Sequence, residues 1–167
     1  GDIQHSRWRD GAVTTPDGFR EAYQQYVAAG WGGVPFPPDY GGGGFPRLVG
    51  MVLQEIMTAA NLSFSMCPLL TQGAIDMLLH FGSEDQREVY LPKMVTGEWS
   101  GTMNLTEPQA GSDVGAITTR ATPADDGTWR ITGQKIFITF GDQDLTDNIV
   151  HLVLARTPDA PEGVKGI

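Results

Sequence analysis

Hydrophobic positions recur with two different periods along the chain. Up to about residue 96, apolar residues return every three to four positions, which is the spacing of amphipathic helices. This spacing, with the start signals given below, predicts four helices, over residues 16–29, 48–60, 68–81 and 84–95. From residue 99 onward, apolar and polar residues alternate or β-branched residues cluster, which is typical of strands. We therefore expect strands over residues 99–105, 117–122, 129–132, 134–140 and 148–156.

Local signals place several ends of these elements. Thr15-Pro16-Asp17 offers a hydroxyl cap, a proline without an amide and an acidic side chain near a helix start. Ser83-Glu84-Asp85-Gln86 has the form of a capping box ahead of the fourth helix. Residues 30–46 are rich in glycine and proline and are expected to be a structured loop or a hinge. Asp126-Gly127 predicts a tight hairpin turn.

The order of these elements predicts the fold class. Apolar helices in succession pack as a bundle, and the strands that follow must form a layer of their own. We expect an α+β multidomain fold, with an N-terminal all-α helical bundle over residues 1–98. A β-barrel or β-sandwich domain is expected to follow over residues 99–167.

Composition and charge narrow the classes of partner. The 167 residues include 11 basic and 20 acidic side chains, a formal net charge of −9, and no segment forms a basic patch. We therefore expect no nucleic-acid partner. No apolar run approaches the ~18 residues of a membrane span, and no signal-like segment opens the chain. Cys67 has neither a disulfide partner nor metal-ligand spacing around it, so we expect a buried thiol, no metal site and a reducing compartment.

Residues 102–115 hold the densest group of candidate functional side chains. Here a predicted strand runs into a loop with two hydroxyls, two acids and two glycines. Such a loop can present backbone amides and hydroxyls to a flat polar ligand or a phosphate. A capped turn between strands explains the same residues equally well. His5, His80, His151 and the glycines at 41–44 lack the neighbours that a catalytic or phosphate-binding motif requires.

Four ordered motifs resemble the acyl-CoA dehydrogenase family. The loop residues Leu105, Thr106, Glu107, Ala110, Gly111, Ser112 and Asp113 match the order of its signature. Tyr40-Gly41-Gly42 resembles its early tyrosine–glycine–glycine loop. Tyr90-Leu91-Pro92-Lys93-Met94 with Gly97-Glu98 resembles the end of its helical domain. Ile131-Thr132-Gly133-Gln134-Lys135 with Phe137-Ile138-Thr139 resembles its second flavin-contacting strand.

The resemblance implies an FAD enzyme that desaturates acyl-CoA thioesters between the α and β carbons and passes electrons to an electron-transfer flavoprotein. Met103, Leu105 and Thr106 would line the flavin ring, Phe137 and Ile138 would cover its other face, and Thr139 would reach the hydride-accepting nitrogen. Ser112 would contact the phosphate region of FAD or of the thioester substrate. The cofactor-binding residues implied are Met103, Leu105, Thr106, Gly111, Ser112, Phe137, Ile138 and Thr139. On the residues alone, Phe137 and Ile138 are favoured as core residues of a β-domain.

The family resemblance also implies what lies outside the chain. The catalytic base of the family is a glutamate of a later helical domain, expected downstream of Ile167, so no catalytic residue is assigned within the chain. Glu107 belongs to the signature loop rather than to the base position. We expect the 167 residues alone to lack dehydrogenase turnover and to bind FAD poorly. The full-length protein is expected to be a homodimer or homotetramer in the cytoplasm, or in the mitochondrial matrix of a eukaryote.

The sequence departs from the family pattern at three places. Asn104 replaces a small residue, and Phe137 replaces a frequent tryptophan and so loses its indole donor. Residues 141–148 are longer and more acidic than the usual turn, which suggests larger or unusual acyl groups. The alternatives are an acyl-CoA oxidase or related flavoenzyme, and a non-catalytic binding protein of the same fold.

Overall fold

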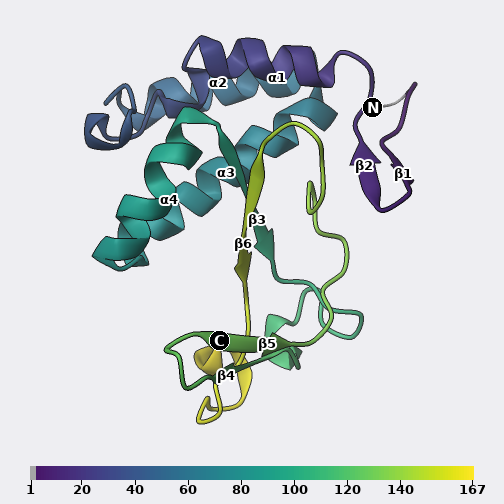
Figure 1. Cartoon of the computed structure of the whole chain (residues 1–167), viewed down its shortest axis with the longest axis vertical. Coiled ribbons are helices and arrows are strands. Elements are labelled where there is room, and N and C mark those ends of the chain that lie inside the picture. The colour runs from purple at the N-terminus through teal and green to yellow at the C-terminus, as the bar shows by residue number, and fades with distance from the viewer. Residues whose placement is uncertain (1–2) are drawn as a thin grey trace. The chain divides into compact units, whose positions relative to one another are not determined.

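The computed structural model describes residues 3–167 and divides them into two compact units (Figure 1). Unit 1 comprises Gly1–Thr102 and Thr139–Val150, and unit 2 comprises Met103–Ile138 and His151–Ile167. Helices dominate unit 1, and short strands and turns make up unit 2. The predicted order of a helical region followed by a β-rich region is confirmed.

Four α-helices form the body of unit 1: α1 (Phe19–Ala28), α2 (Arg47–Ala60), α3 (Leu62–Phe81) and α4 (Glu84–Thr96). Helix α3 contacts both α2 and α4. The capping box of α4 is confirmed: Ser83 Oγ accepts from Gln86 N at 3.2 Å, and Gln86 Oε1 accepts from Ser83 N at 2.9 Å. The α4 helix ends at Gly97, whose φ of 86° suits a glycine.

Helix α3 begins six residues before the predicted start, because Asn61 caps it. The Asn61 side chain accepts a hydrogen bond from Phe64 N at 3.0 Å. Pro68, the expected first residue, therefore lies inside the helix. By length and composition α3 could cross a membrane, but it packs against α2 and α4 and buries Phe64, Cys67 and Ile75, as the core helix of a globular unit does.

The start of α1 also differs from the prediction. The helix begins at Phe19 after Gly18, whose φ is 84°, and no side chain caps it. Thr15 instead donates to Asp144 Oδ1 from both its amide, at 3.1 Å, and its hydroxyl, at 2.6 Å. The Thr15 hydroxyl therefore bonds a residue that is distant in the sequence instead of capping the helix.

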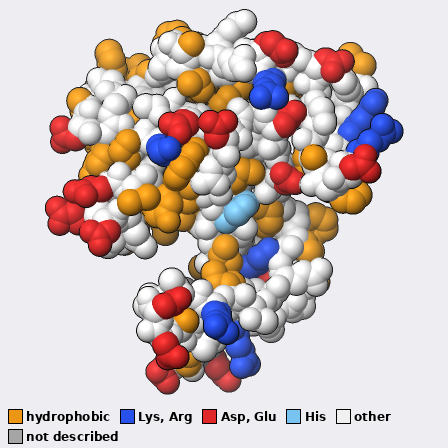
Figure 2. Space-filling model, viewed as in Figure 1, with side chains coloured by type: hydrophobic (Ala, Val, Ile, Leu, Met, Phe, Trp, Pro, Cys, Tyr) orange, Lys and Arg blue, Asp and Glu red, His pale blue; other side chains and the backbone are white. Residues whose placement is uncertain are grey.

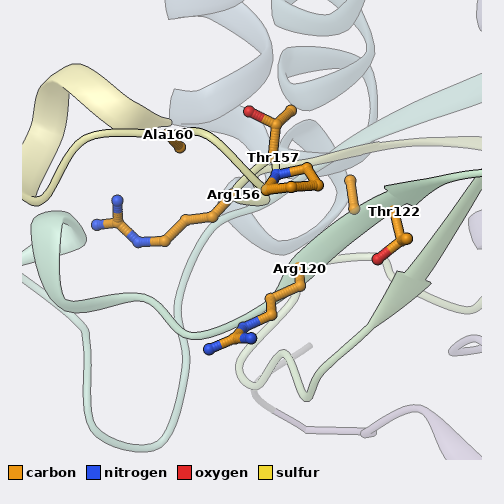
Figure 3. A pocket seen from close by; sticks show the side chains of 7 residues that line it. Arg120, Thr122, Arg156, Thr157 and Ala160 are labelled. Carbon is orange, nitrogen blue, oxygen red and sulfur yellow. The ribbon is translucent and has the colours of Figure 1, made fainter.

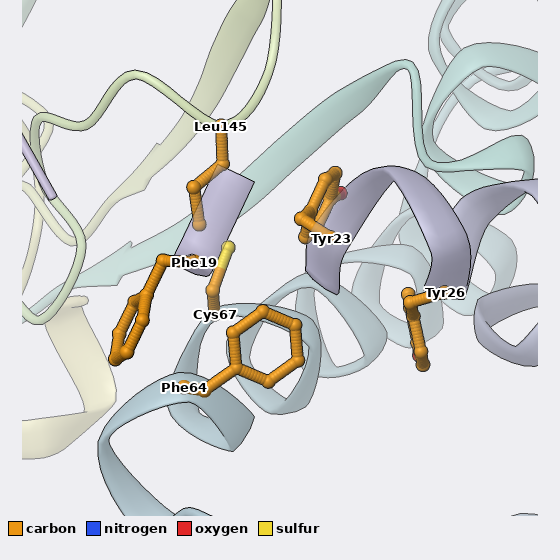
Figure 4. Packing of buried hydrophobic residues seen from close by; sticks show 6 residues of the cluster. All are labelled: Phe19, Tyr23, Tyr26, Phe64, Cys67 and Leu145. Atoms are coloured by element: carbon orange, nitrogen blue, oxygen red, sulfur yellow. The ribbon is translucent and has the colours of Figure 1, made fainter. Parts of the chain in front are cut away.

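Aromatic residues form the core between α1 and α3 (Figure 4). Phe19 meets Phe64 edge-on, with ring centroids 5.6 Å apart. Cys67 is 1% exposed in this cluster, and burial raises the pKa of its thiol to about 12, so it is an inert hydrophobic residue as predicted. The buried members of the cluster are Phe19, Tyr23, Tyr26, Phe64, Cys67 and Leu145.

The segment of residues 139–150 returns to unit 1 and completes this core. Leu145 is buried in the aromatic cluster and Phe140 packs against it. Gln143 is also buried, and its amide donates to Ser100 Oγ at 3.1 Å and to Thr146 Oγ1 at 2.6 Å. The acidic turn seen in the sequence is therefore anchored by Gln143 and Leu145 as well as by Asp144.

Residues 30–46 form a structured loop, as predicted. They contain two short 3-10 turns, Trp31–Gly33 and Pro38–Tyr40, around the fully buried Phe36. Gly42 is required in this loop, because a Cβ there would lie 2.1 Å from the Phe36 carbonyl oxygen.

A hairpin at the start of the chain was not anticipated. Strands β1 (Arg7–Arg9) and β2 (Ala12–Thr14) pair antiparallel around Asp10 and Gly11, with φ values of 53° and 83°. Asp-Gly is the favoured dipeptide for such a turn, so the same signal that identified residues 126–127 was present here.

Unit 2 contains the antiparallel hairpin of β4 (Arg120–Pro123) and β5 (Trp129–Thr132) around the predicted Asp126-Gly127 turn. Asp126 Oδ1 accepts from the Thr128 amide at 3.0 Å and from its hydroxyl at 2.6 Å. These side-chain bonds stabilise the turn and confirm its prediction.

The strands form three two-stranded sheets, β1-β2, β3-β6 and β4-β5, and among the described residues they do not close a barrel. Strand β3 (Trp99–Asn104) pairs with β6 (Asn148–Val153). The predicted strand over residues 134–140 is wrong. Phe137 and Phe140 have φ values of 56° and 51°, and a left-handed backbone interrupts the strand ladder.

Several apolar side chains of unit 1 lie at its surface. Helix α2 exposes Leu48, Met51 and Ile56 by 60% or more. Figure 2 shows hydrophobic side chains at several places on the visible surface of the helical part, interspersed with acidic ones. Gly50 is the buried residue of α2 and lies against Pro35, and Leu53, Gln54, Met57 and Thr58 of this helix are half-buried.

Candidate functional site

The end of β3 leads directly into the predicted flavin-binding residues. Met103 lies in the strand, and Leu105 and Thr106 follow it as irregular backbone; all three are half-buried. Among the described residues, neither the Thr106 amide nor its hydroxyl has a hydrogen-bond partner. Two donors at one half-buried residue are what a polar ligand edge requires.

A tight turn follows at residues 107–110 and closes on itself. Glu107 N donates to Ala110 O at 2.9 Å, and Ala110 N donates to Glu107 O at 3.1 Å. Pro108 and Gln109 occupy the exposed corner of the turn. The turn directs the Glu107 side chain inward, where it is 2% exposed.

The Glu107 carboxylate accepts five hydrogen bonds. Its Oε2 atom accepts from Thr118 N at 2.7 Å, Thr118 Oγ1 at 3.0 Å and Gln109 Nε2 at 2.6 Å. Its Oε1 atom accepts from Thr119 N at 3.0 Å and Lys135 Nζ at 2.8 Å. Both oxygens are therefore fully used within unit 2.

These bonds determine the protonation of Glu107. Burial by itself raises the pKa of the carboxyl group, but the Lys135 ammonium and the amides of Thr118 and Thr119 outweigh burial and hold the pKa well below its usual range. A carboxylate that is so acidic and has no unused lone pair facing solvent cannot act as a general base near neutral pH. The structure thus supports the expectation that Glu107 is not the catalytic base.

Two further contacts join the segment of residues 134–138 to the signature loop. Lys135 Nζ donates to Leu105 O at 2.8 Å as well as to Glu107, and its side chain is 10% exposed. Ile136 N donates to Thr106 O at 3.0 Å. The structure therefore brings Leu105 and Thr106 beside the segment that carries Phe137 and Ile138.

Phe137 is the most unusual residue of this segment. Its side chain is 87% exposed, and its backbone has a φ of 56°, which is costly for an aromatic residue. Phe137 is therefore not a core residue, contrary to the reading from the residues alone, whereas Ile138 is half-buried. A large ring held outward in a strained conformation is typical of a ligand-contacting position.

The remaining predicted residues are less closely connected. Gly111 and Ser112 lie exposed in the loop after the turn, and a Cβ on Gly111 would meet nothing within 4 Å. Thr139 is exposed and begins the segment that belongs to unit 1.

Sequence reasoning missed Lys135, Thr118 and Thr119 as parts of this arrangement. Lys135 stood within a quoted motif, but a lysine beside apolar residues carries no local signal of burial. The threonines are found only once the fold brings residue 118 to the Glu107 carboxylate. A buried acid in a loop predicts such partners in general terms, without saying which they are.

A separate cavity of about 450 Å³ lies elsewhere in unit 2 (Figure 3). Arg120, Thr122, Arg156 and Thr157 line it, and none of the predicted flavin residues does. Arg156 donates to the carbonyls of Ile117 at 2.9 Å, Pro161 at 3.0 Å and Gly163 at 3.1 Å, and also to Gly115 O. Its guanidinium therefore fastens two loops together, which is a structural role. Among the described residues, no group of three or more His, Cys, Asp or Glu side chains could hold a metal ion.

The chain matches the models of two domains of one protein family. The model of the acyl-CoA dehydrogenase N-terminal domain matches residues 3–98, and that of the acyl-CoA dehydrogenase middle domain matches residues 102–167. The chain is 56% identical to 3-methylmercaptopropionyl-CoA dehydrogenase of Ruegeria pomeroyi. The 167 matched residues are 100% of this chain and 28% of that protein.

Solved structures agree with the sequence matches. Butyryl-CoA dehydrogenase of Megasphaera elsdenii superposes with a TM-score of 0.74 at 30% identity, over 88% of this chain and 37% of that one. An acyl-CoA dehydrogenase of Bacillus anthracis complexed with FAD gives a TM-score of 0.72 at 29% identity, over 83% and 23% of the two chains. The helical and β-rich regions with the signature loop define a member of the acyl-CoA dehydrogenase family. The chain belongs to that family and spans 28% of the length of its Ruegeria relative.

Proposed function

We propose that the protein carries out FAD-dependent α,β-dehydrogenation of acyl-CoA thioesters. The observation that carries this proposal is the pairing of residues 105–106 with residues 135–138 in unit 2 through Lys135 and Ile136. The two segments therefore lie side by side. One carries the Thr106 amide and hydroxyl, which have no partner among the described residues, and the other carries the exposed ring of Phe137. Family membership and the FAD complex of a related structure support the same cofactor.

The residues present fit a flavin. The Thr106 amide and hydroxyl would bond the polar edge of the ring system, while Leu105 and Met103 would supply apolar contact beside it. Phe137 and Ile138 would cover a ring face, since a large apolar surface otherwise has no reason to be held in solvent. Gly111, Ser112 and Thr139 remain proposed contacts of the cofactor, and Ser112 of the phosphate region of the substrate.

When bound, the flavin would supply the oxidant that accepts the hydride from the β carbon. The residues of this chain orient and cover the ring system and exclude water from it. Glu107 does not fit the role of base for the α proton, because it is buried and fully hydrogen-bonded. We propose that this base is a carboxylate outside the 167 residues.

The partners proposed follow from the family. Electrons would pass to an electron-transfer flavoprotein, and the full-length protein would be a homodimer or homotetramer in a reducing compartment such as the cytoplasm. A short acyl-CoA is the first substrate to test, because the Ruegeria relative is named for 3-methylmercaptopropionyl-CoA.

The test begins with the visible absorption of the purified full-length protein. Bound flavin and its bleaching by 3-methylmercaptopropionyl-CoA or butyryl-CoA without oxygen are the expected results. Reoxidation by an electron-transfer flavoprotein supports the dehydrogenase, whereas rapid oxygen consumption with peroxide release supports an oxidase. Failure to bind flavin, or flavin that no acyl-CoA reduces, would contradict the proposal.

A further inference from the structure

We propose that Lys135 is a positioning residue that aims the Thr106 amide at the flavin, with Glu107 as its fixed anchor. This inference rests on the proposed flavin site. It assigns a role to two residues that would not themselves touch the cofactor.

The first step concerns the peptide between Leu105 and Thr106. A trans peptide is planar, so its C=O and N–H groups point in opposite directions. Lys135 Nζ donates to Leu105 O at 2.8 Å, which fixes the direction of that carbonyl. The Thr106 N–H must then point away from Lys135, and it has no partner among the described residues.

The next peptide is held in the same way. Ile136 N donates to Thr106 O at 3.0 Å, and Glu107 N on the opposite side of that peptide donates to Ala110 O at 2.9 Å. Both carbonyls that flank the Thr106 amide and side chain are therefore bound. The Thr106 amide and hydroxyl lie between these two bound carbonyls, have no hydrogen-bond partner among the described residues and are left for a ligand.

Lys135 can hold the Leu105 carbonyl because its ammonium has a second partner. An ammonium on a flexible stem needs a second fixed partner to stay in one place. Glu107 provides it at 2.8 Å, and Glu107 is itself fixed by the amides of Thr118 and Thr119. The backbone of residues 118–119 thus fixes the Glu107 carboxylate, and the carboxylate fixes the Lys135 ammonium. The ammonium in turn fixes the Leu105 carbonyl.

Two variants separate positioning from simple stability. Lys135→Met removes the ammonium and leaves a buried, unpaired carboxylate, so it should lower the melting temperature and weaken FAD binding. The double variant Glu107→Gln with Lys135→Met removes both charges, so part of the melting temperature should return. The rest stays lost, because a glutamine side chain cannot accept from both the Thr118 and the Thr119 amides. The Leu105 carbonyl still lacks its donor in the double variant, and its FAD dissociation constant should remain raised by roughly tenfold or more.

The measurements use the full-length holoprotein and its apoprotein. FAD affinity is taken from titration of the apoprotein, and the flavin carbonyl stretches from infrared difference spectra. Loss of a hydrogen bond to a flavin carbonyl raises its stretching frequency, so a band should move upward in both variants. Lys93→Met is the matched control, because Lys93 pairs with Glu98 at 2.8 Å on the surface of unit 1 and should change neither readout.

The results distinguish a positioning role of the Lys135–Glu107 pair from a purely structural one. A double variant that regains both the melting temperature and wild-type FAD affinity, with unshifted carbonyl bands, would show that the pair is structural only and overturn the proposal. Weak FAD binding and shifted bands in a stable double variant support it. A wild-type protein without flavin would refute the proposed function itself, which is a different failure because it appears before any substitution is made.

Discussion

At the scale of single residues, the Glu107 carboxylate holds several segments of unit 2 together. Its five hydrogen bonds come from three separate segments of unit 2. A neutral side chain could not accept all of them, so the negative charge itself is part of the structure.

Glu107 should make the stability of the protein depend on acidity. Because its folded pKa is held below the ordinary 4.5, the unfolded chain binds more protons between the two values, and stability rises with pH there. Its contribution is complete above about pH 5 and is lost progressively as the pH falls. Denaturant unfolding from pH 3 to pH 7 should show a shallower acid slope for Glu107→Gln than for wild type. Equal slopes would mean that the carboxylate is not held in this way.

Phe137 and Phe140 give a matched pair for testing a ligand-contacting role. Both have left-handed backbones, which cost a non-glycine residue about 1–2 kcal/mol, but Phe140 packs against the aromatic core and Phe137 is 87% exposed. Phe137→Gly should leave the melting temperature unchanged or slightly higher and weaken FAD binding. Phe140→Gly should lower the melting temperature, because it removes apolar burial. A large loss of stability in Phe137→Gly would place its ring in a core instead.

At the scale of elements, the sequence predicts what depends on local spacing and misses what depends on distant partners. The four helices and the β4-β5 hairpin follow from periodicity and capping residues, and all are present. The strand over residues 134–140 is absent although its residues favour it, because Lys135 and Ile136 bind the signature loop and Phe137 turns left-handed.

The candidate site likewise has a part that the sequence predicts and a part that it misses. Its loop could be found from the order of hydroxyl, acidic and glycine residues, because that order lies within one segment. The Thr118 and Lys135 contacts of Glu107 could not, since each joins positions far apart in sequence.

The packing of β3 on the helices should depend on Gly101. A Cβ there would lie 2.5 Å from Ala74 Cβ and 2.7 Å from Met94 Cε. Gly101→Ala should therefore destabilise the protein by about 1–3 kcal/mol, measured by denaturant unfolding. Adding Ala74→Gly should return part of this loss.

Gly111→Ala serves as the control for that substitution. Its Cβ would meet nothing within 4 Å and its backbone is not left-handed, so stability should change by less than about 0.5 kcal/mol. If Gly111→Ala destabilised the protein as much as Gly101→Ala, close packing would not be the cause.

At the scale of the whole molecule, the two units differ in how much of their backbone is protected by packing. Helix α3 buries side chains along its length, whereas every residue of β5 is exposed. Amide hydrogen exchange should therefore be slowest in the middle of α3 and much faster in the β4-β5 hairpin. Peptide-resolved mass spectrometry measures this, and equal protection in the two elements would contradict it.

Leu145 gives unit 1 an unusual order of completion during synthesis. Thr15 is bonded to Asp144, 129 residues later, and Leu145 fills the core beside Phe19 and Phe64. At ~5–20 residues per second, the helices wait several seconds after leaving the ribosome before their last core residue is made. In that interval the apolar faces of α1 and α3 lack part of their cover. The nascent chain is thus a candidate for chaperone capture until residues 139–150 have been made.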